Sequence, residues 1–266
     1  MPISALIVAR NEGHQLAACM ETLDWADEIV VVLDRCTDDS ADVARRFTDR
    51  ILEGEWPMQG IRREAGIDST AGPWVFELDA DERVTPALAA ELKAIGETDP
   101  AFDYAKIDVD NFIGQRLVRY GWGASFGKAG TMAVFRKGAK IWGEGRVHPS
   151  IQLIGRRGPD LKGRILHYVD EDVSDMIARL NRYTTSRAAD MRDRGDRGSL
   201  PNDVRRFFSR FFKCYVRRKG YKEGGFGFVV ALMAALFPIL STLKARLDPE
   251  AKGEVPISGG SQITGD

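Results

Sequence analysis

The sequence predicts an α/β fold built on a mixed, mainly parallel sheet that is flanked by helices. Short apolar runs in the first 80 residues alternate with segments of helical spacing, and the connections between them are short. This order is typical of a parallel α/β sheet. One run is apolar at every position rather than at alternate ones, as expected where helices cover both faces of the sheet. The predicted strands span residues 3–8, 28–33, 50–53 and 74–78.

Helices are expected between these strands. Leu16, Met20 and Leu23 recur at helical spacing after the first strand. Thr85 is the expected N-cap of a helix that begins at Pro86, because proline is well tolerated in a first helical turn. That helix is expected to span residues 86–95, and the other helices of this half are expected at residues 61–67 and in a segment that ends at residue 47.

Polar residues follow three of the predicted strands directly. They are Asn11-Glu12, Asp34 and Asp79-Ala80-Asp81. Ligands of parallel α/β sheets bind at the carboxyl ends of the strands, so these side chains should converge at one edge. Asp79 and Asp81 are the candidate metal ligands, since Mg²⁺ and Mn²⁺ prefer oxygen ligands and are usually shared with a phosphate. A solvated acidic turn is the alternative, because loops favour aspartate anyway.

Composition limits the function classes. The 266 residues are 44% hydrophobic and 29% charged, which fits one large domain, or one domain with an appendage. A net charge of −1 gives no bias toward nucleic acid, yet residues 187–222 hold twelve Lys or Arg against four Asp. That asymmetry favours an anionic partner for one face, with a solvated basic surface as the alternative. Three scattered cysteines predict a reducing compartment, and the N-terminal residues lack a basic leader.

Several common enzyme motifs are missing from the sequence. No Gly-x-Gly-x-x-Gly follows the first strand, and there is no Gly-x-x-x-x-Gly-Lys-Ser/Thr or Gly-x-Ser-x-Gly. Dinucleotide-dependent redox chemistry, P-loop chemistry and an α/β-hydrolase are therefore not expected. The histidines and cysteines also lack the spacing of a zinc site.

The middle of the chain is expected to add strands and two aromatic loops. Trp122 and Trp142 lie in glycine-rich segments at residues 120–127 and 142–148. Indole faces beside polar groups suit sugar rings, whereas burial in the core is the alternative for each tryptophan. The strands are expected at residues 104–109, 131–136, 150–154 and 164–168.

The C-terminal part is expected to be helical. A helix over residues 201–218 mixes phenylalanines with arginines, as in helices that lie at a membrane interface; packing on the main domain is the alternative. Residues 224–243 are uncharged and would form a helix about 30 Å long. A shallow or re-entrant membrane helix is the favoured interpretation of this segment. A packed helix and a true membrane span remain open, although Pro238 weakens the span.

The N-terminal motifs resemble those of glycosyltransferase family 2. The matching segments are residues 4–12, 25–34, 37–38 and 78–84. More narrowly, the chain resembles the lipopolysaccharide core-biosynthesis glucosyltransferases of Gram-negative bacteria. His167-Tyr168 and residues 181–184, 218–221 and 224–225 extend this likeness. It covers most of residues 1–245, and the first 85 residues carry the most specific motifs.

The resemblance implies a GT-A fold, a UDP-sugar donor with Mg²⁺ or Mn²⁺, and an inverting reaction. Its residues transfer position by position. Ala9, Arg10 and Glu12 match the loop that holds the nucleoside, and Asp34 matches an acid that contacts the base or ribose. Arg63 matches a basic residue near the diphosphate. Asp79 and Asp81 match the metal-diphosphate motif, in agreement with the need to neutralise a departing diphosphate.

The sequence offers three candidates for the general base. Inversion requires a base that removes the proton of the acceptor hydroxyl. Related enzymes often have Val-His-Glu where this chain has Val147-His148-Pro149, and proline cannot serve as a base. Glu144 and His148 are the local candidates and Asp110 is a more distant third, with a structural role as the alternative for each.

The resemblance and the helical, then glycine- and serine-containing C-terminal sequence together predict a domain organisation. Residues 1–170 would form the GT-A nucleotide-sugar-binding and catalytic domain. Residues 171–248 would form a helical, basic and aromatic appendage that associates with a membrane or with the acceptor, and residues 249–266 a disordered tail.

The predicted function is transfer of a hexose, with glucose as the expected sugar, from a UDP-sugar to a lipid-linked or lipopolysaccharide-core acceptor. The enzyme would work in the cytoplasm, at the inner face of the cytoplasmic membrane. Its expected partners are the nucleotide-sugar, an anionic lipid-linked saccharide and the membrane surface, contacted peripherally through residues 205–243, with no nucleic acid. Pro149 motivates the alternative of a catalytically silent nucleotide-sugar- or membrane-binding module. A sugar nucleotidyltransferase is a third option, which the lack of a glycine-rich first loop disfavours.

Overall fold

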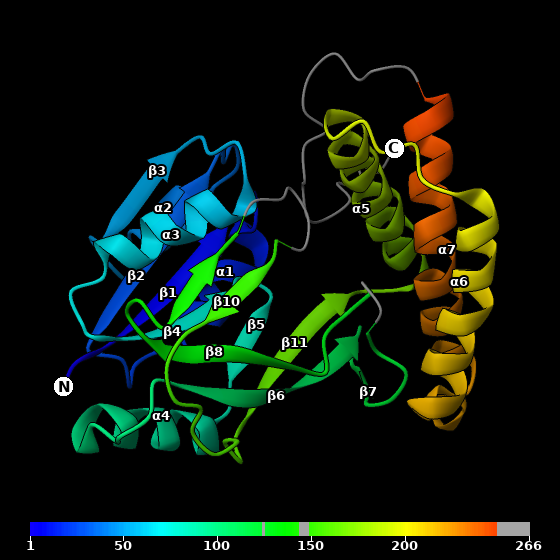
Figure 1. The fold of residues 1–266 in the computed structure, drawn as a ribbon. Helices are drawn as coiled ribbons and strands as arrows, with labels where there is room; N and C mark the ends of the chain where they lie inside the picture. The colour runs from blue at the N-terminus through cyan, green and yellow to red at the C-terminus, as the bar shows by residue number, and fades with distance from the viewer. Residues whose placement is uncertain (124–125, 144–148, 249–266) are drawn as a thin grey trace, which may run out of the picture.

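The computed structural model describes residues 1–123, 126–143 and 149–248, and a mixed sheet forms its centre (Figure 1). The strand order is β3-β2-β1-β4-β8-β6-β11-β5, and β7 pairs with β6. The first four strands in this order are parallel neighbours, as predicted. They are β1 (Ile3–Ala9), β2 (Glu28–Asp34), β3 (Ile51–Gly54) and β4 (Trp74–Asp79). The prediction of an α/β fold is confirmed.

The other half of the sheet mixes both strand directions. Strand β8 runs antiparallel to β4 and to β6, whereas β6 and β11 are parallel. These strands are β6 (Tyr104–Ile113), β8 (Gly130–Arg136) and β11 (Arg164–Asp170). A separate pair is formed by β9 (Lys140–Trp142) and β10 (Ile151–Leu153). Three short strands were not expected from the sequence, namely β5 (Glu82–Val84), β7 (Arg116–Val118) and β9.

Helices cover both faces of the parallel half, which explains its continuous apolar strands. Ile3, Ala5 and Ile7 of β1 belong to a core that includes residues of α1, α2 and α4. Leu6 and Val8 of the same strand point to the opposite face, where α3 packs. The helices are α1 (Gly13–Met20), α2 (Ser40–Ala44), α3 (Gln59–Ser69) and α4 (Pro86–Thr98). Thr85 caps α4 as predicted, since its side chain accepts a hydrogen bond from the backbone N–H of Leu88 at 3.3 Å.

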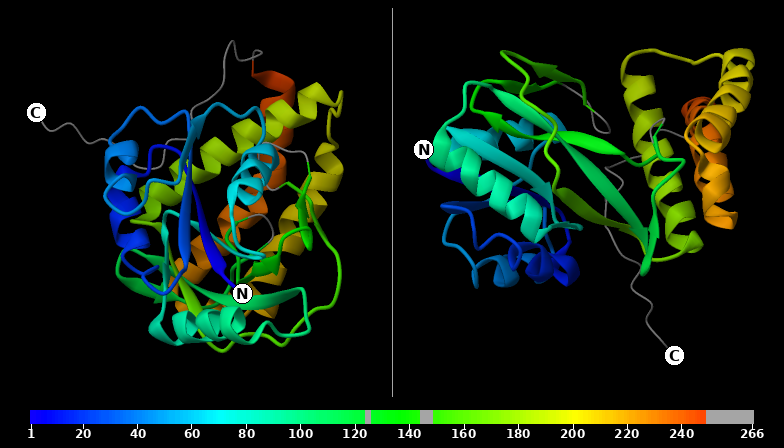
Figure 2. Two further views of the ribbon diagram at one scale, coloured as in Figure 1. Left: turned by 90° about the vertical axis from the view of Figure 1, so that its left-hand side faces the viewer. Right: turned by 90° about the horizontal axis from the view of Figure 1, so that it is seen from below.

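Three helices form a layer at one end of the sheet (Figures 1 and 2). They are α5 (Val173–Asp193), α6 (Leu200–Phe212) and α7 (Gly225–Leu247). The helix expected over residues 201–218 changes after Phe212 into a π-helical turn, Lys213–Arg217, which a 3₁₀ turn, Gly220–Glu223, follows. Arg179 of α5 is tied to Asp170 of β11 by two buried hydrogen bonds of 2.8 and 2.9 Å. The helical layer is thus anchored directly to the sheet.

Helix α7 packs against both α5 and α6. Val230, Ala231 and Ala234 are fully buried in a second core, which includes residues of α5 and the segment after β7. Among the described residues, α7 is the helix that is long and apolar enough to cross a membrane, and 56% of its apolar window is buried inside the protein. Residues 224–243 thus form a helix that packs on the protein, as in the packed alternative, and the membrane-associated helix favoured from the sequence stays a prediction.

Candidate active site

A cavity of about 740 Å³ lies where β1 and β4 end. Arg10 and Glu12 reach it from the loop after β1, Asp79 from the last position of β4, and Asp81 from the turn that follows. Tyr183 of α5 also lines the cavity. The expected convergence of strand-end side chains is present, and the cavity takes residues from both sides of the domain boundary expected after residue 170.

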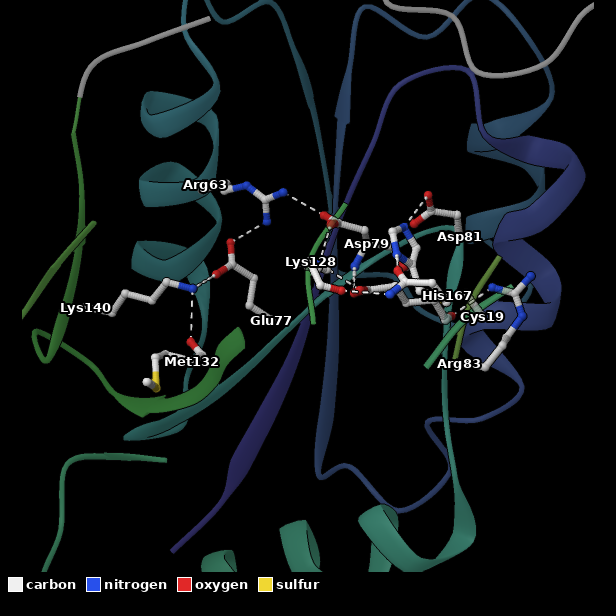
Figure 3. Close-up of polar contacts among 12 residues, drawn as sticks. Cys19, Arg63, Glu77, Asp79, Asp81, Arg83, Lys128, Met132, Lys140 and His167 are labelled. Carbon is white, nitrogen blue, oxygen red and sulfur yellow. Dashed lines mark hydrogen bonds and ion pairs between the residues drawn. The ribbon is translucent and has the colours of Figure 1, made fainter. Parts of the chain in front are cut away.

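Asp79 is held by two cations. Its Oδ1 lies 2.6 Å from Nη2 of Arg63, and its Oδ2 lies 3.2 Å from Nζ of Lys128 (Figure 3). Burial alone would raise the pKa of Asp79, but Arg63 and Lys128 outweigh burial and hold that pKa well below its usual range. Asp79 is therefore ionised and already neutralised by the protein.

Asp81 has a different environment. Its Oδ2 lies 3.2 Å from Nε2 of His167, whose Nδ1 lies 2.8 Å from Oδ1 of Asn111. The second oxygen of Asp81, Oδ1, is buried and has no hydrogen-bond partner in the part of the chain that the structure describes. Buried polar atoms usually have a partner, so this oxygen points to a ligand.

A divalent cation fits this place. Mg²⁺ and Mn²⁺ both accept carboxylate oxygen, and a neutral imidazole is a common ligand of divalent transition metals. No group of three His, Cys, Asp or Glu side chains is gathered for a metal among the described residues. Asp81 and His167 would therefore hold a cation together with oxygens of a bound diphosphate and water, which is how Mg²⁺ is commonly bound.

A buried charge network extends from Asp79 toward β9. Glu77 accepts hydrogen bonds of 2.6 Å from Nη1 of Arg63 and 2.6 Å from Nζ of Lys140. Burial opposes ionisation of Glu77, but Lys140 and Arg63 outweigh it and lower the pKa of Glu77. The indole of Trp142 lies 4.8 Å from the Arg63 guanidinium and lines the cavity. Trp122 is only 2% exposed, so its core alternative is correct.

Glu82 and Arg83 fix the turn that carries the two aspartates. Oε2 of Glu82 accepts a 3.0 Å hydrogen bond from the backbone N–H of Asp79. The Arg83 guanidinium donates to the backbone oxygens of Ala80 at 2.8 Å and of Gln15, in α1, at 3.0 Å. These contacts hold Asp79 and Asp81 in a single arrangement before any ligand binds.

Glu12 is a further acidic side chain of the cavity, which Glu77, Asp79, Asp81 and Glu82 also line. Burial raises the pKa of Glu12 to about 8, and the nearby carboxylates of Asp81 and Asp79 add to the shift, while Arg182 of α5 opposes it. Without a cation, the three carboxylates thus crowd one another, and Glu12 is largely protonated at neutral pH. A positive ligand between them would relieve this repulsion.

The predicted donor-site residues fall into two groups, those that line the cavity and those that do not. Arg10, Glu12, Arg63, Asp79 and Asp81 line the cavity. Ala9 and Asp34 do not contribute to the lining that the described residues form. Asp34 is buried, and its Oδ2 lies 3.0 Å from Nη1 of Arg62, a residue that does line the cavity. The direct contact between Asp34 and a nucleoside stays a prediction.

Of the three candidates for the general base, the structure describes Asp110. Glu144 and His148 lie outside the described residues. Asp110 is buried, lies 2.8 Å from Nη2 of Arg164 and does not line the cavity formed by the described residues. A carboxylate held by an arginine away from the cavity is poorly placed to take a proton there.

Sequence reasoning missed several side chains of the site. Lys128 and Lys140 were not singled out, and His167 was noted only as part of the resemblance. The available signals were weak: Lys128 directly follows the glycine-rich loop, and His167 interrupts an apolar strand. Their contacts with Asp79, Glu77 and Asp81 join residues 49 to 86 positions apart, which no local pattern records.

Comparison with known proteins identifies the family. The family model described as glycosyl transferase family 2 matches residues 4–141. The lipopolysaccharide core biosynthesis glycosyltransferase LpsC of Rhizobium meliloti is 26% identical over 260 residues, which cover 92% of each chain. An uncharacterized glycosyltransferase of Rickettsia felis is 21% identical over 262 residues, covering 92% of this chain and 89% of that protein.

The structure of S. aureus TarS 1–349 in complex with UDP-GlcNAc aligns with a TM-score of 0.49 at 12% identity, covering 92% of this chain and 88% of that one. The match of the family model extends over more than half of the chain and includes Asp79 and Asp81. The chain therefore belongs to glycosyltransferase family 2, and its mixed sheet with flanking helices is the GT-A fold that the resemblance implies.

Proposed function

We propose that the protein is an inverting hexosyltransferase that moves a hexose, with glucose as the expected sugar, from a UDP-sugar to a lipid-linked or lipopolysaccharide-core saccharide. The observation that carries this proposal is the composition of one cavity. Two cations, Arg63 and Lys128, lie beside a carboxylate–imidazole pair, Asp81 and His167, that suits a divalent cation. Positive groups gathered in this way match the diphosphate of a nucleotide-sugar.

The chemistry follows from these positions. When the sugar leaves its donor, negative charge builds up on the diphosphate oxygens, and preorganised cations stabilise that charge. Arg63 is preorganised because Glu77 and Asp79 hold its guanidinium from two sides. A divalent cation held by Asp81 and His167 would neutralise the diphosphate further. Glu144 or His148 would take the proton of the attacking hydroxyl.

The acceptor class is inferred from a relative and from charge. LpsC is described as a lipopolysaccharide core biosynthesis glycosyltransferase, and the likeness extends through the C-terminal helices. Residues 171–248 would serve as the region that meets a membrane or the acceptor, and residues 205–243 would make peripheral membrane contact. An enzyme that acts on such acceptors with UDP-sugars would work on the cytoplasmic side of the membrane.

A donor panel tests the proposal. The full chain is incubated with different UDP-sugars, Mg²⁺ or Mn²⁺ and a bacterial lipid extract, and released UDP and glycosylated lipid are measured. Asp81→Asn should lower transfer by about 100-fold or more, because it removes charge stabilisation at the departing diphosphate. Asp24→Asn, an exposed aspartate, is the matched control and should leave the rate unchanged. NMR of the product linkage tests inversion.

Two results would count against this function. Wild-type turnover by Asp81→Asn on a donor that the parent uses would contradict the assigned role of the cavity. Donor binding without transfer and without slow donor hydrolysis, even with lipid extract present, would instead favour the catalytically silent module.

A further inference from the structure

We propose that the outer face of α6, with the two turns that follow it, is a docking surface for an anionic lipid bilayer. This inference deepens the proposed function, on which it rests for the presence of a lipid-linked acceptor. It assigns membrane contact to α6, its turns and the exposed Phe228 of α7, whereas α7, the more apolar helix, otherwise packs mainly on the protein.

The first observation is an apolar stripe that faces outward. Val204, Phe208, Phe212 and Val216 follow one another at intervals of four and are 47%, 67%, 53% and 44% exposed. Apolar residues at helical spacing normally face a protein core. The opposite side of α6 does pack inward, where buried Asp203 accepts a 2.6 Å hydrogen bond from the Thr242 hydroxyl of α7. The helix therefore has one face for the protein and a second apolar face without cover in the described structure.

The second observation is that this stripe continues onto neighbouring elements. The rings of Phe211 and Tyr215 stack at 5.4 Å, and both meet Phe228 of α7, at 5.6 and 6.1 Å. Tyr221 contacts Tyr215 edge-on at 6.5 Å. Phe228 and Tyr221 are 47% and 51% exposed. Single exposed apolar side chains are ordinary, but contiguous ones mark interaction surfaces.

The third observation is the charge around the stripe. Glu223 is buried and accepts backbone hydrogen bonds from Arg119 and Tyr120, so neither it nor buried Asp203 offers negative charge to the surface. These are the acidic residues of segment 200–223, which leaves its surface uniformly basic. The basic residues are Arg205, Arg206, Arg210, Lys213, Arg217, Arg218, Lys219 and Lys222.

The basic charge of this surface favours an anionic membrane as its partner over a second copy of the chain. Exposed aromatic side chains flanked by arginine and lysine are typical of helices that lie in the headgroup region of anionic membranes. A second copy of this chain would bring two basic faces together, which is unfavourable. Figures 1 and 2 show α5 between the sheet and the α6–α7 pair, so α6 lies away from the nucleotide-binding half. The surface can thus meet a bilayer without covering the strands that hold the donor site.

Vesicle sedimentation of the full chain tests the surface. Vesicles of phosphatidylcholine with phosphatidylglycerol are compared with vesicles of phosphatidylcholine alone, and binding is expected only to the first. Arg205→Gln with Lys213→Gln should weaken binding about fivefold for each charge removed. Phe208→Ser with Phe212→Ser should weaken it as well, because both rings are exposed and would enter the headgroup region.

Matched controls lie elsewhere on the surface. Arg46→Gln with Lys93→Gln removes two exposed charges from the other half, and Ile154→Ser with Ile177→Ser removes two exposed apolar side chains. Both controls should bind vesicles like the parent. UDP-sugar binding should be unchanged in all four variants, which shows that they are folded and keeps this inference separate from the proposed function.

Several outcomes would overturn the inference. They are equal binding to both kinds of vesicle, no binding by the parent, equal loss in the controls, and a dimer in analytical ultracentrifugation that the Phe208 and Phe212 changes dissociate. If vesicle binding fails while UDP-sugar binding and transfer persist, the docking surface is wrong and the proposed function stands. If vesicle binding follows the prediction but no donor is bound or used, the docking surface stands and the proposed function is wrong.

Discussion

Glu77→Gln tests the buried charge network behind the donor site. The Glu77 side chain is 3% exposed, and its two oxygens lie 2.6 Å from Arg63 and 2.6 Å from Lys140. The substitution keeps the shape of the side chain but removes the negative charge between two cations. Arg63 still has Asp79 as a partner, so Lys140, which is 2% exposed, bears most of the loss.

The expected loss of stability is large. Breaking a buried ion pair by removing one partner costs about 3–5 kcal/mol. The amide keeps one acceptor oxygen, so we expect the lower end, about 3 kcal/mol, which corresponds to a fall in Tm of about 6–12 °C for a chain of this size class. Glu53→Gln is the matched control, since Glu53 meets Arg45 at 2.8 Å with both side chains more than half exposed. Exposed pairs contribute about 0–1 kcal/mol, so this variant should melt within about 4 °C of the parent.

The pH dependence gives a second measurement. The pKa of Glu77 is lowered in the folded protein, so its contribution is present above the ordinary value of 4.5 and is lost as the pH falls through the lower folded value. The stability difference between the parent and Glu77→Gln should therefore be full at neutral pH and shrink under acid conditions. Differential scanning calorimetry from pH 3 to pH 8 measures this.

A double variant separates charge pairing from packing. Glu77→Gln with Lys140→Met removes both members of the pair, so it should be less destabilised than the sum of the single changes by about 2 kcal/mol. The reasoning is refuted if Glu77→Gln shifts Tm no more than Glu53→Gln does, or if the two single effects simply add.

Three further predictions concern the site itself. In metal-free buffer, the parent should lose stability as the pH rises from 4.5 to about 8, because the raised pKa of Glu12 lets the folded protein keep a proton that the unfolded chain has released. Glu12→Gln should abolish this loss. Thermal melts at pH 6 and 9 measure the loss, and an equal decline in both proteins contradicts the prediction. Arg83→Met should lower kcat/KM for the donor about 10–100-fold, because the turn that carries the aspartates loses its fixed geometry; steady-state kinetics equal to the parent would exclude this role. Glu144→Gln or His148→Gln should lower kcat about 10²–10⁴-fold if that residue is the base, whereas Asp110→Asn should keep it within about tenfold; the opposite ranking would move the base to Asp110.

The parallel half of the fold was predictable because its signals are local. Apolar runs such as 28–33, short connections and the cap at Thr85 specify each element within a few residues. Polar residues that end parallel strands then meet at one edge by topology alone, which is why the Asp79–Asp81 turn and Glu12 could be joined without coordinates. This part of the site follows from the order of the elements.

The remainder depends on contacts between distant segments. Strand β5 has three residues, two of them charged, and exists because β11 pairs with it, through residues that lie 81 to 85 positions later in the chain. Lys128 reaches Asp79 only because β8 inserts next to β4, an arrangement that no periodicity encodes. The packing of α7 was also hidden, since a buried helix and a membrane-inserted one share the same apolar composition.

The charges of the network distinguish the two aspartates that the sequence motif treats as equals. The protein's own cations are matched by carboxylates within the network. The matched groups are Arg63, Lys128 and Lys140 with Glu77, Asp79 and Glu82. Asp81 lacks a lysine or arginine partner in this network and faces His167, where burial would lower the pKa of the imidazole but Asp81 outweighs burial and raises that pKa. The other oxygen of Asp81 is buried and lacks a hydrogen-bond partner among the described residues. On the proposed function, Asp79 therefore acts mainly by positioning Arg63 and Lys128 against the diphosphate, whereas Asp81 is the aspartate that would bind the divalent cation.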